Sequence, residues 1–143
     1  MKIAIASDHA GVNHKKEIII YLLSQNILVT NLGPENEEKV DYPDYAHPVA
    51  EIVKAKEVDL GILICGSGNG INMSANKHQE IRSALCWSKE IARLSRQHNN
   101  ANILALPARF VSLEEAKEIT KEFIETNFEG GRHEKRVNKI ACR

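Results

Sequence analysis

In residues 61–70, Gly-Ile-Leu-Ile-Cys-Gly-Ser-Gly-Asn-Gly, an aliphatic run expected to form a buried strand leads straight into a polar, glycine-rich turn. The unbroken aliphatic run of Ile62, Leu63 and Ile64 is typical of a parallel strand that is covered on both faces. The three glycines of the turn allow a backbone to approach a ligand closely. A helix expected over residues 71–77 would direct its free N–H groups back at the turn. The stretch therefore predicts a functional site at the end of a central strand.

Strands and helices alternate on both sides of this turn. Strands are expected over residues 2–6, 27–32, 59–64, 82–87 and 101–106. A segment with helical periodicity follows each strand. The first helix is expected to end near residue 25 and the second to contain Val49, Ile52 and Val53. The others are expected over residues 71–77, 88–97 and 112–127, and a last basic helix over 132–141. The alternation predicts a single α/β domain, residues 1–143, with a three-layer doubly wound (Rossmann-like) five-stranded parallel sheet and a C-terminal helical tail.

Two local signals refine these helices. Ser112 and Glu115 have the spacing of a capping box at the start of the last long helix. The acidic stretch 35–44 is expected to be a surface loop, with Pro48 near the first turn of the helix that follows it.

Composition excludes several classes of partner. Lys plus Arg and Asp plus Glu both number 19, so no global charge would hold nucleic acid or an anionic membrane. No apolar run approaches the length of a membrane span. The three cysteines are widely spaced, without a paired Cys-x-x-Cys, which argues against a disulfide framework and a zinc site and favours the cytoplasm.

Four loops are expected to share one edge of the sheet, because the carboxyl ends of parallel strands meet there. They are Ser7-Asp8-His9, residues 65–70, Trp87-Ser88 and residues 107–109. His98-Asn99-Asn100 lies at the opposite end of a crossover helix. In an isolated subunit it would therefore lie away from that edge, unless a neighbouring subunit brings it there.

The familiar glycine motifs do not fit the turn. A Walker A loop needs a lysine that is missing, a dinucleotide fingerprint needs glycine where Ile71 stands, and a nucleophile elbow needs glycine in place of Cys65 and Asn69. There remains a thiol that faces a helix N-terminus and successive amides, an environment expected to lower its pKa and to suit proton abstraction with an enediolate intermediate. The alternative is that Cys65 is one more small buried apolar residue.

Several separate motifs, in order, resemble the ribose-5-phosphate isomerase B family, part of the ribose/galactose isomerase family of sugar-phosphate isomerases, nearly from end to end. They are Ser7-Asp8-His9-Ala10-Gly11, Asp41-Tyr42-Pro43, residues 61–70, Ala75-Asn76-Lys77, Ser95-Arg96-Gln97-His98-Asn99-Asn100-Ala101-Asn102, and Glu129-Gly130-Gly131-Arg132-His133 with Arg136. One branch of the family uses a glutamate directly after the glycine turn, where this chain has Ile71 and keeps Cys65. Ser67 stands where many relatives have threonine, which retains the hydroxyl.

The resemblance implies isomerisation of ribose 5-phosphate and ribulose 5-phosphate, in the pentose phosphate pathway, with neither metal nor organic cofactor. It implies that Cys65 moves a proton between C1 and C2, that Ser67 and the amides of Gly66, Gly68, Asn69 and Gly70 hold the enediolate, and that His98 opens the ring. Asp8 and Asn99 would contact the sugar, and His9, Arg109, Arg132 and Arg136 would bind the phosphate. A homodimer or homotetramer with interfacial active sites is also implied.

Simpler interpretations stay open for several of these residues. His98 could complement a helix dipole, Asp8 and His9 could cap the first helix, and Arg132 and Arg136 could belong to a solvated basic face with Lys135, Lys139 and Arg143. The other four histidines, His14, His47, His78 and His133, have no predicted partner and are expected at the surface. The alternative functions are isomerisation of allose 6-phosphate or galactose 6-phosphate, and sugar-phosphate binding without turnover.

Overall fold

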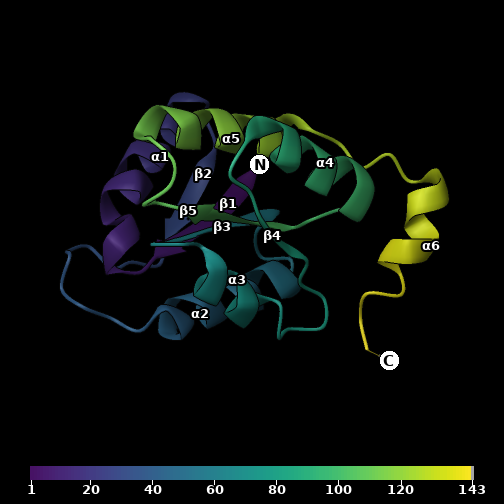
Figure 1. Cartoon of the computed structure of the whole chain (residues 1–143), viewed down its shortest axis with the longest axis horizontal. Coiled ribbons are helices and arrows are strands. Elements are labelled where there is room, and N and C mark those ends of the chain that lie inside the picture. Colours follow the sequence, from purple (N-terminus) through teal and green to yellow (C-terminus); the bar gives the residue numbers. More distant parts are fainter. Residues whose placement is uncertain (143) are drawn as a thin grey trace.

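In the computed structural model, which describes residues 1–142, parallel strands form one sheet between two layers of helices (Figure 1). The strands are β1 (Lys2–Ser7), β2 (Leu28–Asn31), β3 (Leu60–Cys65), β4 (Ser83–Leu85) and β5 (Ile103–Pro107), in the spatial order β2-β1-β3-β5-β4. Every pairing is parallel, which confirms the predicted three-layer, five-stranded α/β sheet. β2 and β4 are shorter than expected because each lies at an edge and pairs on one side only.

The helices divide between the two faces of the sheet. They are α1 (Val12–Ser24), α2 (Tyr42–Lys54), α3 (Asn69–Ala75), α4 (Lys89–Asn99), α5 (Leu113–Glu125) and α6 (Glu134–Val137), with 3-10 turns η1 (His9–Gly11) and η2 (Gly131–His133). α1, α4 and α5 cover one face, and α2 and α3 cover the other (Figure 1). Reciprocal hydrogen bonds of Ser112 and Glu115 confirm the capping box of α5.

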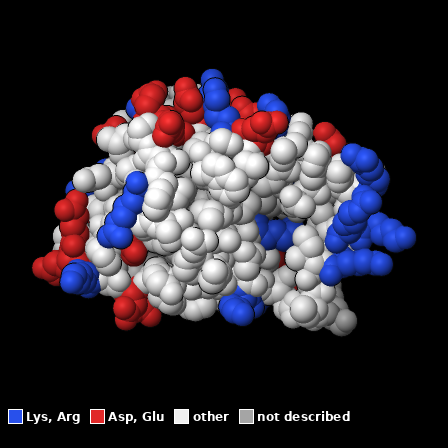
Figure 2. All heavy atoms as spheres, viewed as in Figure 1, with Lys and Arg blue, Asp and Glu red and all other residues white. Residues whose placement is uncertain are grey.

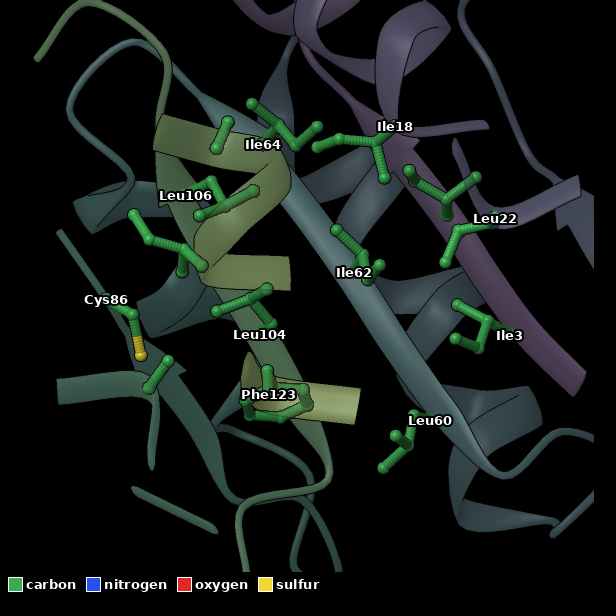
Figure 3. Packing of buried hydrophobic residues seen from close by; sticks show 14 of the residues in the cluster. Ile3, Ile18, Leu22, Leu60, Ile62, Ile64, Cys86, Leu104, Leu106 and Phe123 are labelled. Carbon is green, nitrogen blue, oxygen red and sulfur yellow. The ribbon is translucent and has the colours of Figure 1, made fainter. Parts of the chain in front are cut away.

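The core follows from the central strand β3, which is buried at every position. Its side chains alternate between the faces: Ile62 and Ile64 join the cluster under α1 and α5, which includes Phe123 (Figure 3). Leu63 and Cys65 join the cluster under α2 and α3. The pleat therefore turns the Cys65 thiol toward α3, the helix that follows the glycine-rich turn.

Three helix boundaries differ from expectation. α2 begins at Tyr42, so Pro43 occupies its first turn. Pro48 lies in the helix interior, and because proline has no N–H it donates no hydrogen bond to the Asp44 carbonyl. α3 begins at Asn69, inside the glycine turn, because Gly68 adopts the left-handed conformation at its N-cap. The tail forms η2 and the short α6 in place of a continuous helix over 132–141.

The strand order reverses direction at β1 and β3. In open α/β sheets, ligands bind outside the carboxyl ends of the strands at such a switch point. Here the two loops at that point are the ones that carry Asp8 and Cys65. Within residues 1–142, no helix combines the length and the apolar character needed to cross a membrane.

Candidate active site

The loops that follow β1, β3 and β5 meet at the carboxyl edge of the sheet, as the sequence predicts. Backbone hydrogen bonds connect them: the Asp8 N–H donates to the Ile64 carbonyl at 2.9 Å, and the Arg109 N–H donates to the Gly66 carbonyl at 3.0 Å. A hollow of about 430 Å³ opens beside them, lined by Ser67, Asn69, Leu85, Trp87, Pro107 and Phe110. The residues after β4 thus share this edge as well.

The Cys65 thiol lies at the centre of this edge and is 4% exposed. Burial raises the pKa of this thiol above its ordinary value, and the nearby Asp8 carboxylate raises it further. Backbone N–H groups of Ile71, Gly68 and Ser67 act in the opposite direction by favouring the thiolate. The predicted lowering of the thiol pKa is therefore wrong: the amides are in place, but desolvation outweighs them.

Glycine is required at two positions of the turn for steric reasons. A Cβ atom on Gly68 would lie 2.4 Å from Leu85 Cδ1, and Gly68 has a φ of +75°. A Cβ atom on Gly70 would lie 2.4 Å from Cζ of Tyr42, so the tyrosine ring packs directly on the turn. Tyr42 was not assigned a role from sequence, although it belongs to one of the motifs that carry the resemblance.

Ser67 and Asn69 present polar groups at the surface of the turn. Both side chains are exposed, and the Asn69 N–H donates to Ser67 Oγ at 3.3 Å. Together with the backbone amides of the turn, they form a set of hydrogen-bond donors next to the thiol. Such a set suits an oxygen that becomes negatively charged during a reaction.

The His9 ring is held by the loop that follows β2. Its Nδ1 atom accepts a hydrogen bond from the Val40 N–H at 3.3 Å, so the neutral ring carries its proton on Nε2. Asp8 caps the 3-10 turn η1, which leads into α1, by accepting from the Ala10 N–H at 2.9 Å. The N-cap of α1 itself is Gly11, so the expectation that Asp8 caps the first helix holds only for η1. The sequence contained no signal for the contact between Val40 and His9, because backbone donors cannot be read from residue types.

Arg109 lies close to the glycine turn. Its Nη1 atom is 3.1 Å from the position that a Cβ atom on Gly66 would occupy, and the residue is exposed. Arg109 and His9 therefore place a guanidinium and an imidazole N–H donor at the same edge. Both groups are suited to bind an anion such as a phosphate.

His98, Asn99, Arg132 and Arg136 lie elsewhere in this subunit. His98 and Asn99 end α4, immediately before β5 starts, so the length of β5, about 15 Å, separates them from the carboxyl edge. η2 and α6, which carry the two arginines, lie at the far end of the molecule in Figure 1, and Figure 2 shows Lys and Arg side chains gathered there. The predicted site is thus divided into two groups within one chain.

The second group has its own structure. The His98 and His133 rings stack with centroids 4.3 Å apart and planes 12° apart, and Glu129 Oε2 lies 4.0 Å from His98 Nε2 and 3.5 Å from His133 Nε2. Burial, the His98 charge and the charge of Arg132 lower the pKa of His133. The expectation of a surface His133 without a partner is therefore wrong, since this residue is 9% exposed and stacks on His98.

This cluster is also a group of side chains that could hold a metal ion. Ligand atoms of His98, Glu129 and His133 lie within 4.8 Å of one another. Because the two rings stack with their planes 12° apart, their nitrogen lone pairs lie in two nearly parallel planes and do not meet at one point.

The remaining histidines also have partners. His47 Nδ1 lies 2.8 Å from His78 Nε2, and His78 Nδ1 lies 2.9 Å from Glu51 Oε1. His14 Nε2 lies 2.9 Å from the Val111 carbonyl oxygen. Folding pairs these side chains across distances in sequence that no local pattern reveals.

Comparison with known proteins assigns the family. A family model described as Ribose/Galactose Isomerase matches residues 3–140. The chain belongs to the ribose/galactose isomerase family. Within it, ribose-5-phosphate isomerase B from Escherichia coli (strain K12) is 46% identical over 141 residues, which cover 99% of this chain and 95% of that protein. Probable ribose-5-phosphate isomerase B from Mycoplasma pneumoniae is 48% identical over 139 residues, 96% of this chain and 91% of that protein.

Solved structures of the ribose/galactose isomerase family share the fold. Ribose 5-phosphate isomerase from Thermotoga maritima superposes with a TM-score of 0.96 at 50% identity, covering 98% of this chain and 97% of that chain. Ribose-5-phosphate isomerase B from Mycoplasma genitalium, solved with bound ribulose-5-phosphate, has a TM-score of 0.93 at 48% identity, covering 97% of this chain and 93% of that one. The predicted resemblance is confirmed over nearly the whole chain.

Proposed function

We propose that this chain interconverts D-ribose 5-phosphate and D-ribulose 5-phosphate through an enediolate, as a step of the pentose phosphate pathway. The observation that carries the proposal is the buried Cys65 thiol at the β1/β3 switch point, surrounded by backbone N–H donors. It occurs in a chain 46% identical to ribose-5-phosphate isomerase B of Escherichia coli. The whole chain, residues 1–143, acts as one isomerase domain in the cytoplasm.

Cys65 is the base of the proposed reaction. Its thiolate removes the proton from C2 of the open-chain aldose, and the electron pair moves through C1 onto the carbonyl oxygen. After a proton passes from O2 to O1, the thiol returns its proton to C1 and the ketose forms. Because the thiol pKa is raised, the thiolate is a strong base once formed, and the amides of Gly68 and Ile71 favour its formation.

The turn stabilises the intermediate. Ser67 and the amides of Gly66, Asn69 and Gly70 would bind the enediolate oxygens as their negative charge develops. Asp8 would contact the sugar hydroxyls from the end of β1.

The remaining groups would come from two subunits. His9 and Arg109 of one subunit bind the phosphate, and Arg132 and Arg136 of a partner subunit complete the binding site. His98 of a partner subunit opens the sugar ring, and Asn99 lies beside it. The division of the predicted site between two ends of the chain supports a homodimer, or a homotetramer built from such dimers, with interfacial active sites.

A comparison of Cys65→Ala with Cys86→Ala tests the assignment of the base. Both cysteines are buried, so each variant replaces one buried thiol by a hydrogen atom and the two substitutions are chemically equivalent. Conversion of ribose 5-phosphate, followed by ¹H NMR, should fall by about 10³-fold or more in Cys65→Ala and stay near wild type in Cys86→Ala. Calorimetry should still detect ribose 5-phosphate binding to Cys65→Ala. If the wild-type protein binds ribose 5-phosphate but does not convert it, the chain is a sugar-phosphate binding module and the proposed reaction is wrong.

The substrate assignment needs its own measurement, because the family includes isomerases named for galactose. We expect a higher kcat/KM for ribose 5-phosphate than for allose 6-phosphate or galactose 6-phosphate. A strong preference for either hexose phosphate would overturn it.

A further inference from the structure

Lys15 is a fully buried lysine in the first turn of α1. Its relative exposure is 0%, and no other Lys or Arg of residues 1–142 is buried. The Nζ atom donates to Asn31 Oδ1 at 2.8 Å and lies 3.5 Å from Glu35 Oε1. Burying an ammonium group is costly, and an apolar residue of similar size is often as stabilising or more so. Stability alone therefore does not explain a lysine here.

The partners of Lys15 lie where β2 passes into the loop 32–41. Asn31 Oδ1, the acceptor for Lys15, also accepts from the Gly33 N–H at 3.0 Å, and Asn31 Nδ2 donates to Glu35 Oε1 at 2.7 Å. The network therefore ties the first turn of the loop to α1. Burial lowers the pKa of the Lys15 ammonium, and Glu35 opposes that change.

The same loop and the residue that follows it touch the candidate site at three places. The Gly33 carbonyl accepts from the Ser7 N–H at 3.0 Å, next to Asp8. The Val40 N–H donates to His9 Nδ1. The loop then leads into α2, whose first residue, Tyr42, packs on Gly70.

We propose that Lys15 is a positioning residue for the phosphate site. By holding the first turn of the loop 32–41, it keeps the Val40 N–H on His9 Nδ1, so that the His9 Nε2–H faces the site. The polar partners of Lys15 are Asn31 and Glu35, neither of which is assigned to the substrate, so Lys15 acts through the loop. The inference rests on the proposed function only for the identity of the anion that His9 binds.

The test uses Lys15→Met with Lys16→Met as its matched control, because Lys16 is the exposed neighbour of Lys15. Kinetics with ribose 5-phosphate should show KM raised about fivefold to tenfold in Lys15→Met and kcat within about twofold of wild type. Lys16→Met should match wild type. In case Lys15→Met does not fold, Asn31→Ala breaks the same network from the exposed end of β2 and should raise KM in the same way.

A second readout does not depend on turnover. In ¹⁵N-histidine-labelled protein, His9 Nδ1 should give the signal of an unprotonated nitrogen in wild type and Lys16→Met. In Lys15→Met or Asn31→Ala that signal should move toward the average of two tautomers, and calorimetry should show weaker binding of inorganic phosphate. A KM and a His9 signal that stay as in Lys16→Met, with only a lowered melting temperature, would overturn the proposal. An absence of ribose 5-phosphate turnover in wild type would overturn the proposed function and leave the His9 signal to decide the role of Lys15.

Discussion

Replacing Gly68 by alanine should disrupt the turn that follows β3. The residue has a φ of +75°, and a Cβ atom there would lie 2.4 Å from Leu85 Cδ1 and 3.2 Å from backbone atoms of Leu106 and Pro107. The left-handed conformation costs an L-residue about 1–2 kcal/mol. The steric overlap adds about 1–3 kcal/mol, because the backbone neighbours cannot move as a flexible side chain would. The free energy of unfolding should therefore fall by about 2–5 kcal/mol.

Gly131→Ala is the control for the conformational part of this cost. Gly131 has a φ of +54° and no neighbour within 4 Å of an added Cβ atom, so only the cost of the left-handed conformation applies. Urea unfolding followed by circular dichroism should show a loss of about 1–2 kcal/mol in Gly131→Ala. In Gly68→Ala, kcat should also fall about tenfold or more, because the Gly68 N–H moves away from the thiol. Equal losses of stability in the two variants would refute the steric reasoning.

Three further outcomes follow from the titrating groups and from the proposed chemistry. Alkylation of Cys65 by iodoacetamide should accelerate with pH, with a midpoint above that of a cysteine thiol in the unfolded chain, because burial raises the pKa of Cys65. Asp8→Asn should lower that midpoint, and a wild-type midpoint at or below the unfolded-chain value would contradict the expected direction. Burial raises the pKa of Cys86 to about 12, so above pH 9 the unfolded chain loses a proton that the native chain keeps. Stability should therefore decline from pH 9 toward pH 12, and the decline should be shallower in Cys86→Ala, whereas parallel curves would exclude this cause. Dialysis against EDTA should leave kcat for ribose 5-phosphate unchanged, and a loss restored by adding a divalent ion would show a metal requirement.

Most of the fold could be predicted because it depends on local patterns. The aliphatic run that ends at Cys65 indicates a central parallel strand, and the alternation around it predicts the layers. The start of α3 differs from the predicted one because it depends on the left-handed conformation of Gly68. That residue packs against Leu85 and β5, which are distant from it in sequence. Pro48 was misplaced because either of two prolines suits a first turn, and Pro43 occupies it.

The candidate site could also be predicted in part, where it depends on topology, and not where it depends on packing. Residues at strand ends, such as Asp8, Cys65 and Arg109, could be placed together from topology alone. The raised pKa of the Cys65 thiol could not be foreseen, because it is a balance between burial and amide donors that only packing determines. The stacking of His133 on His98 could not be foreseen either, since the two residues are distant in sequence and on different elements.

The proposed mechanism requires Cys65 of one subunit to work with His98 of a partner subunit. Unfolding Cys65→Ala and His98→Asn together and refolding the mixture measures whether it does. Random pairing gives heterodimers in half of the molecules, each with one intact site of two, so the mixture should regain about a quarter of the wild-type ribose 5-phosphate turnover. Turnover no higher than that of the two variants refolded separately would contradict a shared site.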